Sequence, residues 1–383
     1  MRNKRLDLLR GIAILLVMGV HVPAFPTWVR IGWLGVDLFF VLSGFLISNL
    51  LFAEYRKSGT ISVKRFYLRR AFKLYPSFYL LILGTIVFSM FTNRELQPVH
   101  VIGELVFVQN YMGGLWGHTW SLAVEEHFYL ILPLLILWMT RRSESEPFRQ
   151  LPMFFAIAAV ACLGLRIITS EMLPFSHAAQ FEPSHLRFDS LFFGVLLAYC
   201  QNFRSAVIVF WTSRCRKLLF FISFFAILPS LILPYSNRFV YTLGFSLAYV
   251  SFGGLLLLAL YGDDGQAAPI TRSSPAERVL QKIGLFSYPI YLVHAPMAMM
   301  FAALYNWLVE RAWPANPYLL FGAYLCSSIL AGGCLSKLVE LPMLRIRDRY
   351  LPRLADPAIA IPRPAPEGPR ELKGVFPEPL PNG

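Results

Sequence analysis

Long apolar runs, separated by polar or charged connections, follow one another along most of the chain. A helix needs about 20 apolar residues to cross the hydrocarbon layer of a membrane. We find ten such runs, the sixth of them short, and the pattern therefore predicts an all-α integral membrane protein with about ten transmembrane helices. The runs lie at residues 6–25, 34–53, 74–92, 122–139, 152–170, 187–201, 217–234, 239–261, 283–305 and 318–341.

Two further stretches do not fit the pattern of crossing helices. Residues 101–110 are apolar but too few to cross, so we expect a re-entrant or interfacial segment there. Residues 346–383 are polar and rich in proline, which is typical of a disordered tail. We therefore predict a membrane domain over residues 1–345 and a cytoplasmic tail without a second folded domain.

The composition agrees with a membrane protein and excludes several soluble classes. Hydrophobic residues make up 56% of the 383 residues and charged residues only 15%. A single soluble core cannot hide so large an apolar fraction, so a soluble nucleic-acid-binding protein is excluded despite the net charge of +13. The five cysteines show no zinc-binding spacing, and we predict no metal site.

The basic residues are distributed very unevenly between the two sides of the predicted membrane domain. With the N-terminus inside, 27 of the 35 lysines and arginines fall in the inner connections or the tail, and only 4 fall in the outer connections. Cytoplasmic connections of membrane proteins carry this excess of basic residues. The distribution predicts that both termini are cytoplasmic and accounts for most of the net charge.

The first two apolar runs contain ionisable residues, which are costly in a membrane and mark function by default. Arg10 and His21 are eleven residues apart and share one face of an ideal helix, and Asp7 can pair with Arg10 on that face. Asp37 lies near the outer end of the second run. Two interpretations of Asp37 stay open: it faces His21 and orients the imidazole ring, or it lies at the interface beside Arg30.

The fourth and sixth runs carry further charges. Ser121 and Glu125 are four residues apart and share a helix face, whereas Glu126 points elsewhere. A glutamate next to so apolar a run needs partners, and we favour a functional role for Glu125. In the sixth run, a structural ion pair between Arg187 and Asp189 is favoured over direct chemistry.

The last two runs bring polar groups to defined positions. Ser287, Tyr291 and His294 are spaced so that they line one stripe of a helix. Glu340 ends the tenth run close to the inner surface and is spaced to pair with Lys337.

Residues 54–73 form the densest basic segment of the chain, with seven lysines and arginines. Arg70 and Lys73 are three residues apart and present two cations on one helical face. The segment suits contact with anionic lipid, and it also suits a clamp for the phosphates of a cytosolic nucleotide-like ligand. The chain has no Walker-type or GxGxxG loop, which disfavours an NTPase or a dinucleotide site.

Six motifs stand in an order that resembles the membrane-bound acyltransferase family 3, the polysaccharide and antibiotic O-acyltransferases. The resemblance extends over about residues 1–345. The motifs are Arg10-x10-His21, Gly35-Val-Asp37 through Ser43-Gly44, Trp120-Ser121-Leu-x-x-Glu125-x-x-Phe-Tyr129, Arg187-x-Asp189-x-Leu-x-x-Gly194, Ser287-Tyr288-x-x-Tyr291-Leu-x-His294 and Glu340-x-Pro342.

The resemblance implies transfer of an acyl group, usually acetyl, from a cytosolic acyl-CoA to a hydroxyl of a cell-envelope glycan or a lipid-linked precursor. It implies acyl-CoA as a co-substrate, no permanently bound cofactor and no nucleic-acid partner. In the family the histidine matching His21 is essential, and the arginine matching Arg10 matters strongly. An Arg-x-x-Arg motif that contacts CoA falls on Arg70 and Lys73, where lysine replaces the second arginine and lacks its bidentate fork.

Our hypothesis is therefore an acyl-CoA-dependent O-acyltransferase of the inner (cytoplasmic) membrane. His21 acts as general base on the acceptor hydroxyl, held by Asp37 or Glu125, and an acyl-histidine intermediate is the competing mechanism. Arg10, Arg70 and Lys73 are the expected acyl-CoA contacts. Trp120 and Tyr129 are candidate surfaces for a sugar, although packing between helices is commoner for such rings. The full set of candidate substrate-binding residues is Trp120, Ser121, Tyr129, Arg187, Asp189, Tyr291 and His294.

Two alternatives to glycan acylation stay open. The acceptor is a small molecule such as a macrolide in the first alternative. In the second, the chain transports a polysaccharide intermediate and is no enzyme. Transport would require the charges inside the membrane to line a continuous path and would not involve acetyl-CoA.

Overall fold

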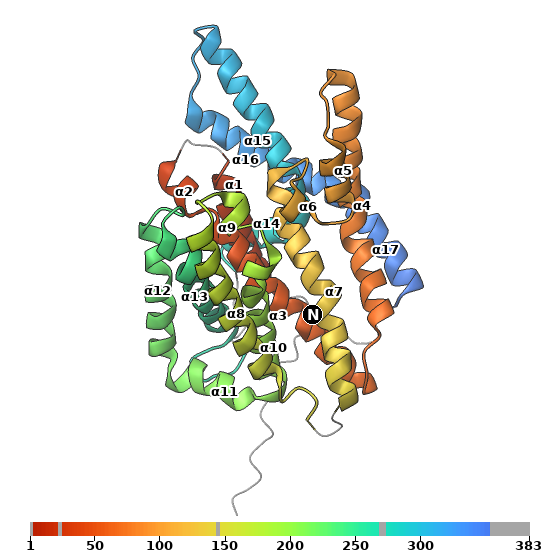
Figure 1. Ribbon diagram of the computed structural model, residues 1–383, viewed down its shortest axis with the longest axis vertical. Coiled ribbons are helices and arrows are strands. Elements are labelled where there is room, and N and C mark those ends of the chain that lie inside the picture. Colours follow the sequence, from red (N-terminus) through yellow and green to blue (C-terminus); the bar gives the residue numbers. More distant parts are fainter. Residues whose placement is uncertain (1–2, 22–24, 143–145, 268–272, 353–383) are drawn as a thin grey trace, which may run out of the picture.

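The computed structural model describes residues 3–21, 25–142, 146–267 and 273–352, which form a bundle of helices without a β-strand among them (Figure 1). Each of the ten apolar runs coincides with a helix, so the predicted all-α class is confirmed. The helices of these runs are α1 (Lys4–Gly19), α3 (Leu34–Ser58), α4 (Val63–Thr92), α7 (Trp120–Arg142), α8 (Leu151–Met172), α10 (Phe188–Phe203), α12 (Arg216–Ile232), η4 (Val240–Gly244) with α13 (Phe245–Leu260), α15 (Ser287–Glu310) and α16 (Pro317–Leu335).

Not all of these helices are long enough to cross a membrane. Seven helices of the described chain have the length and apolar character of a span, and an eighth results if α10 and the helix Ser205–Arg214, bent by 107° from it, count as one. The helices α1 and α12 have 16 and 17 residues. At 1.5 Å per residue both are shorter than the hydrocarbon layer of about 30 Å. The chain is a multi-pass membrane protein, and the count of ten spans stays a prediction.

Shorter helices occupy the connections between the long ones. The stretch 101–110, predicted not to cross, is split between two helices of eight and four residues, with a break at Phe107 where φ is 58°. These lengths are far below that of a span. The short helices are α2 (Pro26–Ile31), α5 (Pro98–Leu105), α6 (Gln109–Met112), η1 (Gly117–Thr119), α9 (His177–Gln180), η2 (Ser184–Leu186), α11 (Ser205–Val209), η3 (Phe210–Arg214), α14 (Pro275–Leu285), η5 (Ser336–Glu340) and α17 (Leu341–Tyr350).

The two ends of the bundle carry different connections. The start of α4, the end of α7 and the helix α11 lie at the lower end in Figure 1, and all three belong to connections predicted to be inside. The helix α2 and the connection between α15 and α16, predicted to be outside, lie at the upper end. Of the predicted tail 346–383, residues up to Tyr350 continue α17, and residues 353–383 lie outside the described part of the chain.

Glycines let two central helices approach each other closely. A Cβ atom on Gly44 of α3 would lie 2.0 Å from the Leu191 carbonyl oxygen, and one on Gly194 of α10 would lie 2.3 Å from the Val41 carbonyl oxygen. Small residues allow such backbone contact between membrane helices, where packing rather than the hydrophobic effect drives association. The pair α3 and α10 therefore forms a rigid centre on which the other helices pack.

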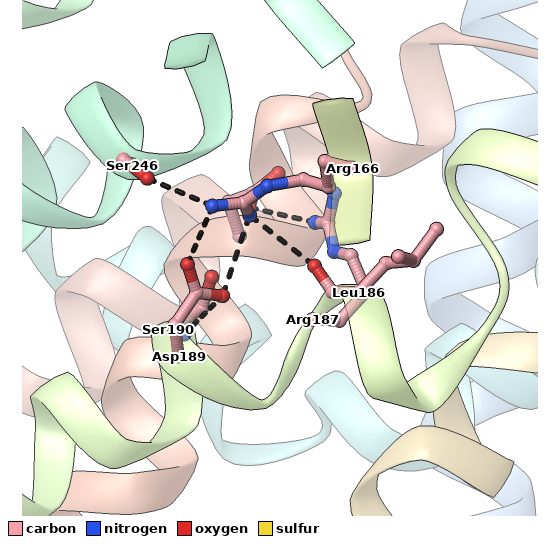
Figure 2. A network of polar contacts seen from close by, with 7 residues as sticks. Arg166, Leu186, Arg187, Asp189, Ser190 and Ser246 are labelled. Atoms are coloured by element: carbon pink, nitrogen blue, oxygen red, sulfur yellow. Dashed lines mark hydrogen bonds and ion pairs between the residues drawn. The ribbon is translucent and has the colours of Figure 1, made fainter. Parts of the chain in front are cut away.

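Two buried ion pairs tie α3, α8 and α10 together. Arg166 of α8 pairs with Asp189 of α10 (Nη2 to Oδ2, 2.7 Å) and also donates a hydrogen bond to the Ser246 hydroxyl, as Figure 2 shows. Arg187, just before α10, pairs with Asp37 of α3 (Nη2 to Oδ1, 2.7 Å). All four charged side chains are no more than 1% exposed. Pairing is required there, since an unpaired buried charge is strongly destabilising.

The observed partners correct two sequence-based interpretations. Arg187 and Asp189 do not pair with each other, because Arg187 pairs with Asp37 of α3 and Asp189 with Arg166 of α8. Asp37 pairs neither with His21 nor with Arg30, because its carboxylate is paired with the guanidinium of Arg187. Asp37 is thus not the residue that orients the His21 ring.

Candidate active site

A cavity of about 590 Å³ lies between the helices α1, α3, α4, α7, α15 and α17. Six of the candidate site residues predicted from the sequence line it, although they come from four separate helices. They are Arg10, Arg70, Lys73, Ser121, Glu125 and Tyr291. The remaining candidates His21, Asp37, Trp120, Tyr129, Arg187, Asp189 and His294 do not line it.

The cavity is strongly basic along the side that the sequence assigns to the cytoplasm. Besides Arg10, Arg70 and Lys73, four further arginines contribute to its wall, and they outnumber the acidic residues there. These arginines are Arg56, Arg65, Arg69 and Arg347; the acidic residues are Asp7, Glu54 and Glu125. A cavity with this excess of cations suits a ligand that carries several phosphates.

The C-terminal helix α17 completes this basic wall. Arg69 of α4 pairs with Asp348 (Nη2 to Oδ1, 3.1 Å) and also donates to the carbonyl oxygen of Leu351. Arg347, adjacent to Asp348, lines the cavity itself. Sequence reasoning missed Arg347, because the segment after residue 345 was expected to be a tail.

Glu125 lies at the centre of a polar network in the cavity wall. Its carboxylate accepts hydrogen bonds from the Ser43 hydroxyl (2.8 Å) and the Tyr129 hydroxyl (2.9 Å). Arg70 lies 3.5 Å from the same carboxylate, and its guanidinium covers the Tyr129 ring at 3.8 Å from the ring centre. Glu125 therefore fixes Arg70 in the cavity and does not hold His21.

The aromatic candidates for sugar stacking are both covered. Tyr129 is 1% exposed and lies under the guanidinium of Arg70. Trp120 is also buried, with the guanidinium of Arg187 at 5.9 Å from its ring centre and the imidazole of His177 in a T-shaped arrangement at 5.9 Å. Neither ring presents an open face on which a sugar could stack.

The far end of the cavity is formed by Ser121 and Tyr291. Their hydroxyl oxygens are 2.6 Å apart, and the Tyr291 hydroxyl also donates to the His118 carbonyl oxygen at 2.5 Å. These contacts join the start of α7 to α15. The i,i+4 face shared by Ser121 and Glu125 is confirmed, because both side chains reach the same cavity.

Three histidine rings connect this end of the cavity with the surface. The His118 ring lies 5.4 Å from that of Tyr291 and 4.8 Å from that of His294. The His294 ring lies 4.9 Å from that of His21, which is exposed in the turn after α1. His294 and His118 are buried. The sequence-based candidates omitted His118, whose signal was its position directly before the Thr-Trp-Ser-Leu motif.

His21 itself is not on the helix that was predicted to carry it. The helix α1 ends at Gly19, so the ideal helix face shared by Arg10 and His21 does not extend to His21. Pro23 follows in the sequence, and proline shortly after a helix is a typical terminator. Arg10 lines the cavity, whereas His21 lies beyond the buried His294.

A buried glutamate outside the cavity, Glu104, forms hydrogen bonds with the segment that leads into α7. The Glu104 carboxylate of α5 accepts from the Thr119 hydroxyl (2.8 Å) and from the backbone N–H of Trp116 (3.2 Å). Burial raises the pKa of Glu104 to about 7. These bonds fix the backbone on either side of His118. Within the described chain, no group of three or more His, Cys, Asp or Glu residues is arranged to hold a metal ion.

Comparison with known proteins identifies the family to which the chain belongs. Two similar relatives are the peptidoglycan O-acetyltransferase OatA of Listeria monocytogenes, 25% identical over 81% of this chain, and the O-acetyltransferase OatA of Staphylococcus aureus, 27% identical over 82%. The matched regions span 51% and 53% of those relatives, so the chain covers about half of their length. No solved structure matches the chain significantly. The family profile described as an acyltransferase domain matches residues 3–337, and the chain belongs to this family of acyltransferases.

Proposed function

We propose that this chain is an O-acyltransferase that moves an acyl group, in the simplest case acetyl, from a cytosolic acyl-CoA to a hydroxyl of a cell-envelope glycan or lipid-linked sugar. The observation that carries the proposal is the basic cavity, in which Arg10, Arg70 and Lys73 converge from two helices. The phosphates of CoA match these cations. The names of the two relatives describe O-acetyl transfer, and one of them names peptidoglycan.

The cavity also suits the shape of an acyl-CoA. Its basic wall offers contacts for the phosphates, and the thioester would lie at its far end, beside Ser121 and Tyr291. We propose that the pantetheine arm runs between these two regions. The rings of His118 and His294 separate that end from His21. The thioester therefore reaches His21 only when these two side chains move aside.

His21 is the proposed general base. It removes the proton of the acceptor hydroxyl, the oxygen forms a bond with the acyl carbon, and the bond between that carbon and the CoA sulfur breaks. The sulfur leaves as a thiolate and takes up the proton. In the competing mechanism His21 attacks the thioester first and carries the acyl group on its ring.

The proposed location is the cytoplasmic (inner) membrane, with ten spans and both termini in the cytoplasm. This orientation places the basic cavity wall on the cytosolic side, where acyl-CoA is found. It rests on the 27 to 4 distribution of basic residues between the two sides. The variants Lys64→Cys and Arg311→Cys, treated separately in whole cells with a membrane-impermeant thiol reagent, test this orientation. We expect the reagent to label the cysteine at position 311 and not the one at position 64.

Isothermal titration of the purified chain with acetyl-CoA tests the donor. We expect the double variant Arg70→Gln with Lys73→Gln to weaken binding at least about tenfold, because two charged contacts to phosphate are lost. Lys64→Gln is the matched control, since Lys64 belongs to the same basic segment but does not line the cavity. Equal affinity of all three proteins for acetyl-CoA, or no binding of acetyl-CoA to the unaltered chain, would refute acyl-CoA as the donor and favour transport.

A second experiment tests His21. We expect His21→Ala to abolish transfer of radioactive acetyl from acetyl-CoA to a peptidoglycan tetrasaccharide while acetyl-CoA still binds. Full transfer by this variant would refute the role of His21. Label that stays covalently on the unaltered chain, but not on the variant, would favour the acyl-histidine mechanism.

A further inference from the structure

A second histidine at this end of the bundle has a carboxylate partner, which His21 does not have among the described residues. The Nδ1 atom of His177 lies 3.0 Å from the Glu182 carboxylate. Among the described residues, His177 is the only histidine paired with a carboxylate. A carboxylate on one ring nitrogen holds that nitrogen protonated and leaves the other nitrogen as a hydrogen-bond acceptor.

The His177 ring is held on three sides. It stacks on Phe181 with ring centres 4.8 Å apart at 15°, and it forms a T-shaped pair with Trp120 at 5.9 Å between ring centres. Glu182 holds its third side. Within the described part of the chain no hydrogen bond engages Nε2, and the His177 side chain is 45% exposed. An exposed imidazole with one free acceptor atom and a fixed orientation is prepared to meet a ligand.

The backbone that carries this ring is equally well supported. Ser176 caps the start of α9, accepting from the backbone N–H of Ala179 at 3.1 Å. Gln180 accepts from the backbone N–H of Ser176 and donates to the carbonyl oxygen of Pro174. Asn110 of α6 donates to the carbonyl oxygen of Glu182 at 3.2 Å. The connection between α8 and α10 is thus fixed although it lies at the surface.

His177 also lies close to the proposed reaction centre. Its ring lies 5.9 Å from that of Trp120, whose neighbour Ser121 is hydrogen-bonded to Tyr291. The Tyr291 ring lies 5.3 Å from that of His294, which in turn lies 4.9 Å from that of His21. The helix α9 and the end of α1 lie at the same end of the bundle in Figure 1. A molecule that reaches His21 from outside therefore approaches the same end of the bundle as His177.

We infer that His177, oriented by Glu182, forms a subsite for the acceptor, in which Nε2 accepts a hydrogen bond from a sugar hydroxyl next to the one that is acylated. The inference rests on the proposed function, because it assigns the acceptor side of the same reaction. Sugars carry several hydroxyls, so an acceptor can present one hydroxyl to His21 and another to His177. Fixed polar groups of this kind determine which hydroxyl is presented to the base.

The test is a comparison of steady-state kinetics for His177→Ala and His185→Ala with acetyl-CoA and the peptidoglycan tetrasaccharide. His185 is the matched control: it is exposed on the same segment, stacked on Tyr111, and lacks a carboxylate partner in the described structure. We expect His177→Ala to raise the acceptor KM about tenfold, with kcat within about threefold and unchanged acetyl-CoA affinity. Glu182→Ala should raise the acceptor KM in the same direction, and His185→Ala should change neither constant.

Several results would overturn the subsite. An acceptor KM equal to that of the unaltered chain removes His177 from the acceptor site. A fall in kcat with unchanged KM makes His177 the base instead. Loss of acetyl-CoA binding in His177→Ala shows a purely structural role. If the unaltered chain binds acetyl-CoA but neither binds nor acylates the tetrasaccharide, the acceptor class and the subsite both fail while the donor assignment stands.

Discussion

Replacement of Arg166 by methionine would leave the Asp189 carboxylate buried without its counter-ion. In the structure Arg166 meets both oxygens of Asp189, at 2.7 and 3.4 Å, and also donates to Ser246 and to the carbonyl oxygen of Leu186 (Figure 2). After the change, the Ser190 N–H at 3.0 Å remains as a donor to Asp189.

The expected loss follows from these contacts. Breaking a buried ion pair by removing one partner destabilises a protein by about 3–5 kcal/mol, because an uncompensated charge stays in the interior. Removing both partners, in Arg166→Met with Asp189→Leu, leaves no buried charge, and we expect a loss below about 2 kcal/mol. The double variant should therefore be more stable than the single variant.

Unfolding in detergent, followed by helix content, measures these differences. Acetyl-CoA titration of the folded protein is the second measurement, and we expect it to be unchanged because neither residue lines the cavity. Arg166→Met with the stability of the unaltered chain would refute the ion-pair argument. A stable variant that no longer binds acetyl-CoA would instead place Arg166 and Asp189 in the site.

Two further predictions concern acidic residues. Glu104 has a pKa raised by burial to about 7, above its ordinary value of 4.5, so its contribution to stability is present at low pH and is lost as pH rises through about 7. Thermal unfolding should therefore show less stability at pH 8 than at pH 5, and Glu104→Gln should flatten this dependence; an unchanged slope contradicts the assignment. Glu125→Gln removes the carboxylate 3.5 Å from Arg70, and acetyl-CoA should bind several-fold tighter because the cavity becomes more positive. Weaker binding by titration would contradict this, and would mean that the loss of the contact that positions Arg70 outweighs the gain in positive charge.

The helices themselves could be predicted from local composition. An apolar run of about 20 residues has no other stable conformation in a membrane than a helix, because each backbone polar group must be satisfied within its own segment. The exact ends of the helices were harder to predict from the sequence. The first helix stops at Gly19, before His21, and the tenth run continues through η5 into α17, which brings Arg347 to the cavity.

The residues of the site could be predicted only in part from the sequence. The spacing of Arg70 and Lys73 places both on one helix face, and both line the cavity. The partners of Asp37 and Glu125 were not predictable, because they depend on which faces of α3, α7 and α10 meet. His177 and Glu182 meet in a surface connection, where no periodic pattern marks a contact.

The sequence alone therefore determined the helical membrane character and its basic side, since both follow from the composition of single segments. The tertiary structure decided which charges pair and which residues share the cavity. Helices that are apolar on most sides give little indication of which face is turned inward. Close packing at glycines such as Gly194 sets that rotation between α3 and α10, and with it joins Arg187 to Asp37.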